Sequence, residues 1–177
     1  MKLLKRFIVI LIVLVVVLAA GAYMLPRNVS VARSITINAT PEIVFPLVNS
    51  LQEGQKWSPW LSLDPDVTLV FSGPESGVGN QLEWSSDHPN VGNGKQVITA
   101  SEQNKLVATD LDFGDMGTAR AALRLDPAGT GTKVTWSFEA DMGMNPMGRW
   151  MGLMMDRWVG GDYEKGLANL KALAEGG

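Results

Sequence analysis

Cysteine is absent from the 177-residue chain, and histidine occurs only once, as His88. Without cysteine the chain has no disulfide, thiolate nucleophile or zinc–cysteine site, and a single histidine excludes a two-histidine metal site. Acidic residues outnumber basic ones, 18 to 15, so the net charge is −3. A negative net charge argues against a nucleic-acid-binding surface. The sequence therefore predicts no metal, no cofactor and no nucleic-acid partner.

Recognisable catalytic patterns are missing as well. No Ser–His–Asp or Glu-x-x-His spacing occurs, and His88 lies in a Ser-Ser-Asp-His-Pro-Asn stretch with the composition of a turn. Asp110 and Asp112 are close in sequence, but they alternate with apolar residues and so fall on the outward face of a predicted strand. We therefore predict no catalytic residues.

The N-terminus contains a long apolar run. Residues 7–25 carry no charge, follow three basic residues and are long enough to cross a hydrocarbon core of about 30 Å. We interpret residues 1–26 as a single-pass signal anchor in the inner (cytoplasmic) membrane, with the domain 27–177 on the periplasmic, extracytoplasmic side. The alternative is a secreted domain released by cleavage near Ala22, where small residues fit a signal-peptide site.

Alternating apolar and polar residues predict a first strand at 29–37, followed by a helical segment that begins at Thr40-Pro41. Six further strand-like runs cover 67–71, 77–84, 95–101, 106–113, 118–125 and 133–140. The connections between these runs are short, so neighbouring strands are antiparallel. We predict an α+β domain in which a curved antiparallel sheet of about seven strands wraps around a long C-terminal helix.

The C-terminal helix is predicted from Asn145, a suitable N-cap, to Ala174. Its apolar residues are predicted to form one stripe made of Met147, Met151, Met154, Trp158, Leu167, Leu170 and Ala174. The first half is apolar on most faces, so it must be covered or must border a cavity. Gly160-Gly161 in the middle predicts a kink or a close contact.

The candidate ligand-pocket residues are large apolar side chains from inward strand faces, from the Trp57–Trp60 loop and from the C-terminal helix. They are Trp57, Trp60, Phe71, Trp84, Phe113, Trp136, Trp150, Met151, Met154 and Trp158. The simpler interpretation of each is an ordinary core residue. Methionine thioethers adapt to apolar ligands of varied shape, which favours a deformable pocket wall.

Arg33, Thr109 and Tyr163 are the candidate polar anchors. Arg33 falls on the apolar face of the first strand, where an unpaired charge would be costly. Two interpretations of Arg33 stay open, namely an ion pair with Asp162 or Glu164 and an anchor for an anionic ligand group.

Five motifs resemble one protein family. They are Ala-Thr-Pro-Glu-Ile-Val-Phe, Trp-Ser-Pro-Trp, Ser-Gly-Pro-Glu-Ser-Gly-Val-Gly, Gly-Thr-Lys-Val-Thr-Trp and Gly-Leu-Ala-Asn-Leu-Lys-Ala-Leu. Together they resemble the SRPBCC superfamily (START, birch-pollen allergen and polyketide cyclase), in particular its bacterial polyketide cyclase/dehydrase-like branch, over residues 29–174. The resemblance implies a helix-grip fold that binds hydrophobic small molecules or lipids in a cavity. Catalytic residues vary among the subfamilies, and none is matched here.

We favour an exported, membrane-tethered domain that binds a hydrophobic or lipid-like small molecule between the sheet and the C-terminal helix. Residues 7–25 would hold it in the membrane. The first alternative is an enzyme of the polyketide cyclase/dehydrase type, which needs a polar group inside the cavity. The second is an interaction module whose Met/Trp-rich helix docks onto a membrane protein or onto the bilayer.

Overall fold

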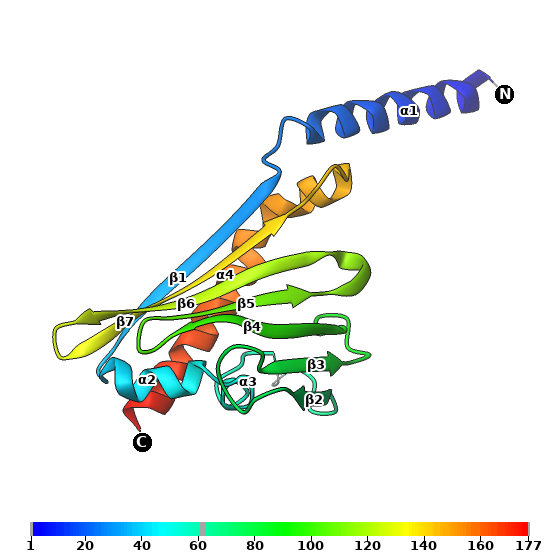
Figure 1. Cartoon of the computed structure of the whole chain (residues 1–177). Coiled ribbons are helices and arrows are strands. Elements are labelled where there is room, and N and C mark those ends of the chain that lie inside the picture. The colour runs from blue at the N-terminus through cyan, green and yellow to red at the C-terminus, as the bar shows by residue number, and fades with distance from the viewer. Residues whose placement is uncertain (1, 61–62, 177) are drawn as a thin grey trace.

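The computed structural model describes residues 2–60 and 63–176, in which one antiparallel sheet lies against a long C-terminal helix (Figure 1). The strands are β1 (Asn28–Ile37), β2 (Thr68–Ser72), β3 (Gln81–Ser85), β4 (Gly94–Glu102), β5 (Leu106–Asp112), β6 (Thr118–Ala128) and β7 (Gly131–Asp141). Their order in the sheet is β1-β7-β6-β5-β4-β3-β2. The seven-stranded antiparallel sheet predicted from the sequence is confirmed, with β1 closing the meander against the last strand.

Strand β3 is shorter than predicted. It begins at Gln81 instead of residue 77, because Gly77 and Gly79 adopt φ angles of 75° and 89°. Such left-handed conformations suit glycine in a turn and do not continue a strand. Val78, between them, is therefore exposed and does not lie on the inner face of the sheet.

Side chains alternate across the sheet as the sequence predicts. The inner face of the sheet carries Val134, Trp136 and Phe138, which are all buried. The opposite, outer face carries charged residues of the central strands, including Asp110 of β5 and Arg120 of β6, which are cross-strand partners. The charged side chains thus remain near water while the apolar ones build the core.

Two short helices, α2 (Pro41–Val48) and α3 (Leu51–Gly54), close one end of the sheet. Pro41 occupies the first turn of α2, as predicted, and Val44, Phe45 and Val48 are its buried residues. These helices lead into the Trp57–Trp60 loop and so place two indoles over the inner face of the sheet.

Helix α4 (Pro146–Glu175) is continuous through Gly160 and Gly161 and packs mainly along β1. The prediction of one apolar stripe is wrong. Trp158 and Leu167 are nine residues apart, which at 3.6 residues per turn is about two and a half turns, so they point to opposite sides of the helix. Leu167 and Leu170 are buried, whereas Met151, Met154 and Trp158 are exposed.

Helix α1 (Lys2–Ala22) projects away from the sheet and meets the domain at the start of α4 (Figure 1). Residues Leu3–Ala22 have a mean hydropathy of 2.9 and, by length and composition, suit a membrane span. A signal peptide has the same properties, so the anchor and the cleaved signal both remain predictions.

Candidate functional site

Four aromatic rings occupy the middle of the space between the sheet and α4. Trp136 stacks on Tyr163, with ring centroids 3.8 Å apart and an interplanar angle of 6°. Trp57 and Trp60 meet Trp136 edge-on, at centroid distances of 5.1 Å and 5.9 Å. Gly166 of α4 makes room for this cluster, because a Cβ there would lie 2.8 Å from Trp136 Cζ3. Trp57, Trp60 and Trp136, which we predicted as pocket residues, thus pack against one another in the core.

Hydrogen bonds fix the orientation of these rings. Trp57 Nε1 donates to the Leu47 carbonyl oxygen at 2.9 Å, and Trp60 Nε1 donates to Asp162 Oδ2 at 3.2 Å. Burial raises the pKa of the Tyr163 phenol above its ordinary value, so this hydroxyl stays neutral and keeps its proton. Tyr163, which we selected as a polar anchor, therefore carries a neutral phenol at the edge of the aromatic cluster.

A second aromatic group lies on the inner face nearer the β2 edge of the sheet. The rings of Trp84 and Phe113 meet edge-on at 5.9 Å, and both side chains are half-buried. Trp84 lies across Gly94 of the neighbouring strand, where a Cβ would be 2.4 Å from its ring, and its Nε1 donates to the Val91 carbonyl oxygen at 3.3 Å. Phe71, the next aromatic residue on this face, is 36% exposed at the sheet edge.

One polar pair is set into this apolar inner face. Gln96 Nε2 donates to Thr109 Oγ1 at 3.2 Å, and Thr109 Oγ1 lies 3.5 Å from the Ala121 carbonyl oxygen. Thr109 is buried and was expected from strand alternation, whereas Gln96 was missed. A bulge between Ile98 and Ala100 breaks the alternation of β4, so the sequence does not reveal which face Gln96 occupies.

We define the inner-face patch as Trp84, Gln96, Thr109, Leu111 and Phe113. It lies on β3, on β4, on β5 and just beyond the end of β5, while α4 packs along β1 and, to a lesser extent, β7. All of its members except Thr109 are half-buried. The patch therefore combines partly accessible aromatic and aliphatic surface with two neutral hydrogen-bonding groups, which suits an apolar molecule bearing one polar group.

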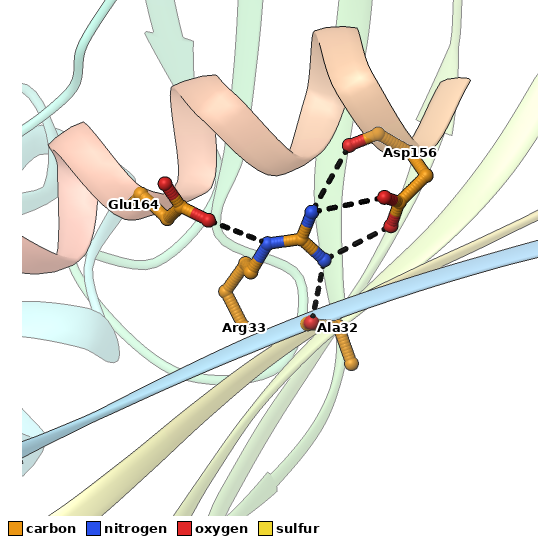
Figure 2. A network of polar contacts seen from close by, with 4 residues as sticks. All are labelled: Ala32, Arg33, Asp156 and Glu164. Atoms are coloured by element: carbon orange, nitrogen blue, oxygen red, sulfur yellow. Dashed lines mark hydrogen bonds and ion pairs between the residues drawn. The ribbon is translucent and has the colours of Figure 1, made fainter. Parts of the chain in front are cut away.

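Arg33 is paired with α4 (Figure 2). Its Nε donates to Glu164 Oε1 at 2.8 Å, and its two terminal nitrogens donate to the Asp156 carboxylate at 2.9 and 3.1 Å. The remaining two N–H groups reach the carbonyl oxygens of Ala32 and Asp156. All five guanidinium donors are thus engaged, which confirms the ion-pair interpretation and leaves none for a ligand.

The partners of Arg33 were predicted only in part. Glu164 is confirmed, whereas Asp162 is replaced by Asp156. Asp156 and Glu164 lie one turn before and one turn after Gly160, whose backbone the guanidinium approaches so closely that a Cβ would be 2.2 Å from Arg33 Nη2. Gly160 therefore marks a close contact, one of the two outcomes predicted for the glycine pair. The hydrogen bonds that the Asp156 carboxylate accepts from Arg33 lower its pKa.

Trp150, Met151, Met154 and Trp158, which we selected as pocket residues, lie on α4 away from its buried side. Their exposed fractions are between 39% and 48%. Met155 and Val159, on another side of the same turns, pack against the core instead. The structure therefore separates the selected residues into the filled aromatic cluster, the neighbourhood of the inner-face patch and this exposed side of α4.

Two shallow grooves lie on the outer face of the sheet. The larger has a volume of about 870 Å³ and is lined by Lys95, Asp110, Arg120 and Glu139 among other residues. Arg120 forms an ion pair with Asp110 at 3.4 Å and lies opposite Glu139 in the sheet register. Neither groove lies between the sheet and α4. Their charges are mixed and solvated, as expected for cross-strand pairs on an outer face.

The loops bring Asp64 next to Ser86, 22 residues later in the chain, and its neighbour His88. Ser86 Oγ donates to the carboxylate of Asp64, while the backbone N–H of His88 donates to Ser86 Oγ at 2.9 Å. The His88 Nδ1 atom accepts from the backbone N–H of Asn90 at 3.3 Å. In this arrangement the serine proton is directed at Asp64 and away from the imidazole, so it is not a nucleophile–base pair. Among the described residues, no group of acidic or histidine side chains could hold a metal ion.

Asp141 gives the domain a pH dependence that can be tested. The Arg27 guanidinium, which donates to both carboxylate oxygens, lowers the pKa of Asp141 from its ordinary 3.8 to about 2. A lowered folded-state pKa stabilises the domain above about pH 4, and this contribution is lost as the pH falls towards 2. We expect Asp141→Asn to lower the Tm at neutral pH, with the difference from wild type closing between pH 4 and 2. A constant difference over that range would contradict this assignment.

Comparisons with known proteins agree with this geometry. The model of the family described as polyketide cyclase / dehydrase and lipid transport matches residues 28–175. A comparison with curated protein sequences gives no match. Solved structures with the same fold include norcoclaurine synthase from Thalictrum flavum, at 13% identity and a TM-score of 0.64 over 83% of this chain and 94% of that one. The predicted helix-grip architecture is thereby confirmed.

Two further structures illustrate the breadth of the fold. The Aha1 protein of Colwellia psychrerythraea is 20% identical, with a TM-score of 0.56 over 83% of this chain and 96% of that one. The di-domain ARO/CYC StfQ of the steffimycin biosynthetic pathway is 11% identical, with a TM-score of 0.62 over 84% of this chain and 51% of StfQ. At these identities the likeness concerns the fold alone.

Proposed function

The chain belongs to the polyketide cyclase/dehydrase and lipid transport family, and from this premise we propose that it is a membrane-tethered domain that binds a hydrophobic or lipid-like molecule at the inner-face patch. The observation that carries the proposal is the Gln96–Thr109 pair within half-buried apolar surface. Apolar pockets with one or two well-placed polar groups are typical of small-molecule sites, where the polar groups orient the ligand.

The polar pair has capacity left for a ligand. No hydrogen bond reaches Gln96 Oε1 within residues 2–60 and 63–176, and no buried side-chain oxygen or nitrogen in that part of the chain lacks a partner. The Gln96 carbonyl oxygen is therefore accessible and can accept a hydrogen bond from a hydroxyl or amide of the bound molecule. Both groups are neutral, which favours an alcohol or amide head over a carboxylate.

Native mass spectrometry of residues 27–177, purified without detergent, tests this proposal. The segment contains every strand and the whole family match, so it holds the complete sheet and α4. We expect an added mass that disappears on organic extraction. The double variant Gln96→Leu/Thr109→Val removes the polar pair while keeping side-chain size. It should reduce affinity about fivefold for one lost ligand hydrogen bond and about thirtyfold for two, at about 1 kcal/mol per hydrogen bond.

The matched control is Thr135→Val, the same exchange at a half-buried position on the outer face. It should leave the added mass unchanged. A clean unliganded mass, together with no uptake of a long-chain alcohol or an isoprenoid alcohol at micromolar concentration, would argue against ligand binding. Equal loss in both variants would place the ligand elsewhere than the inner-face patch.

A further inference from the structure

The exposed side of the first half of α4 forms a continuous apolar surface. We define the α4 stripe as Met147, Trp150, Met151, Met154 and Trp158, which recur at three- and four-residue steps and share one side of the helix. Met147 is 68% exposed and Met154 46% exposed. The stripe is about 17 Å long at 1.5 Å per residue and includes no acidic side chain. Surfaces of this kind mark interaction sites.

The start of α4 lies near the C-terminal end of α1 (Figure 1), and the two helices are in contact. Trp150 Nε1 donates to the Leu18 carbonyl oxygen at 3.1 Å, and a Cβ on Gly21 would lie 3.8 Å from Trp150 Cζ2. The Tyr23 hydroxyl donates to the Met144 carbonyl oxygen at 3.3 Å. These contacts place the start of α4 against the C-terminal end of α1.

Arg149 fastens this junction. Its side chain is buried and donates to the carbonyl oxygens of Tyr23 at 3.3 Å, Leu25 at 3.4 Å and Gly143 at 3.1 Å. Its guanidinium also lies 5.2 Å from the centroid of the Tyr23 ring. Tyr23 and Leu25 follow the last residue of α1, so the guanidinium lies just beyond the C-terminal end of this helix, where the helix dipole favours a cation. Arg149 therefore holds the first turn of α4 at the level where α1 ends.

The contact with Leu18 gives the depth of the stripe at Trp150, near its start. Leu18 lies four residues before the end of α1, which at 1.5 Å per residue is about 6 Å inside the apolar helix. If α1 crosses a bilayer, Trp150 lies in the zone between headgroups and acyl chains, where tryptophan side chains are enriched. A helix with an apolar face lies at that depth with the face turned into the lipid.

We propose that the α4 stripe is a bilayer-docking surface, inserted into the outer part of the same membrane that α1 spans. This docking rests on the membrane tether of the proposed function and would give the domain a fixed orientation relative to the bilayer. The chosen occupant is lipid, because the stripe is continuous with the apolar surface of α1, whose residues from Leu3 to Leu18 are all exposed.

The cysteine-free sequence allows a direct test with the full chain. Met154→Cys and Ala172→Cys are each labelled with an environment-sensitive fluorophore and reconstituted into phosphatidylethanolamine/phosphatidylglycerol vesicles. The two positions are 18 residues apart, five full turns, and both are exposed, so Ala172 is a matched control on the same side of α4. The Met154 label should be quenched by nitroxide-bearing lipid and should be several-fold less sensitive to aqueous iodide than the Ala172 label.

Each other outcome overturns the docking proposal and has its own meaning. Equal iodide quenching at both positions in carbonate-resistant vesicles means that α1 is a tether and the stripe is free. Protection from iodide without nitroxide quenching means that protein, such as a second copy, covers the stripe. Release of the chain by carbonate means that the tether itself has failed.

Discussion

Replacing Gly160 with alanine is expected to destabilise the domain, whereas the same replacement at Gly161 is expected to stabilise it. A Cβ at position 160 would lie 2.2 Å from Arg33 Nη2 and 2.6 Å from Arg33 Cζ, so the guanidinium must move out of its hydrogen-bonding position. A Cβ at position 161 meets no atom within 4 Å. The two neighbouring glycines therefore differ in their surroundings, because Gly160 contacts the Arg33 guanidinium and the space beside Gly161 is open.

The expected magnitudes have opposite signs. Overpacking costs about 1–3 kcal/mol, and the loss of the Arg33 contacts adds to it, so we expect Gly160→Ala to lower the free energy of unfolding by about 2 kcal/mol after the gain in helix propensity. Gly161→Ala should raise it by about 1 kcal/mol, the propensity difference between alanine and glycine in an exposed helix.

Urea unfolding of residues 27–177 measures both values. A Gly160→Ala variant as stable as Gly161→Ala would show that Arg33 moves aside without loss, and the ion-pair network would then be unimportant for folding. Arg33→Met tests whether Arg33 causes the destabilisation by Gly160→Ala. In the Arg33→Met background the added methyl group at position 160 meets a flexible apolar chain, so Gly160→Ala should lower the free energy of unfolding by less.

The Arg33 network shows what the sequence could predict and what it could not. An arginine on the apolar face of a strand requires an acidic partner, and strand alternation was enough to place it. To identify that acidic partner, one must also know which turn of α4 lies opposite Arg33. Asp156 and Glu164 flank Gly160 by one turn each, whereas Asp162 lies on another side of α4 and accepts from Trp60. That choice depends on how β1 lies against α4, which no local pattern contains.

The predicted single stripe on α4 combines residues from two opposite sides of the helix. Three- and four-residue steps were followed correctly within each half of the helix, but the nine-residue step from Trp158 to Leu167 turns the apolar side by about half a turn. The sheet alternation was more reliable. It fails where a bulge intervenes, as at Ile98 and Ala100 beside Gln96, and where the glycines on either side of Val78 form a turn before β3 begins.

Trp136→Ala is expected to have the largest effect on stability. Trp136 is buried and contacts Trp57, Trp60 and Tyr163, so its removal leaves a cavity that the rings around it cannot close. Truncating a buried tryptophan costs about 3–5 kcal/mol, which lowers the Tm of a domain of this size by roughly 6–20 °C. Trp158→Ala, at a side chain that is 45% exposed, should change stability by less than about 1 kcal/mol.

Added indole distinguishes a filled core from a ligand site. If Trp136 only fills space, the cavity in Trp136→Ala should bind indole, and millimolar indole should recover part of the lost Tm, because a ligand that binds the folded state alone stabilises it. Wild type should not respond. Recovery by indole, with uptake of apolar ligands at the inner-face patch unchanged, would assign Trp57, Trp60 and Trp136 to the core. Loss of that uptake together with stability recovered by indole would instead make the aromatic cluster one wall of the ligand site.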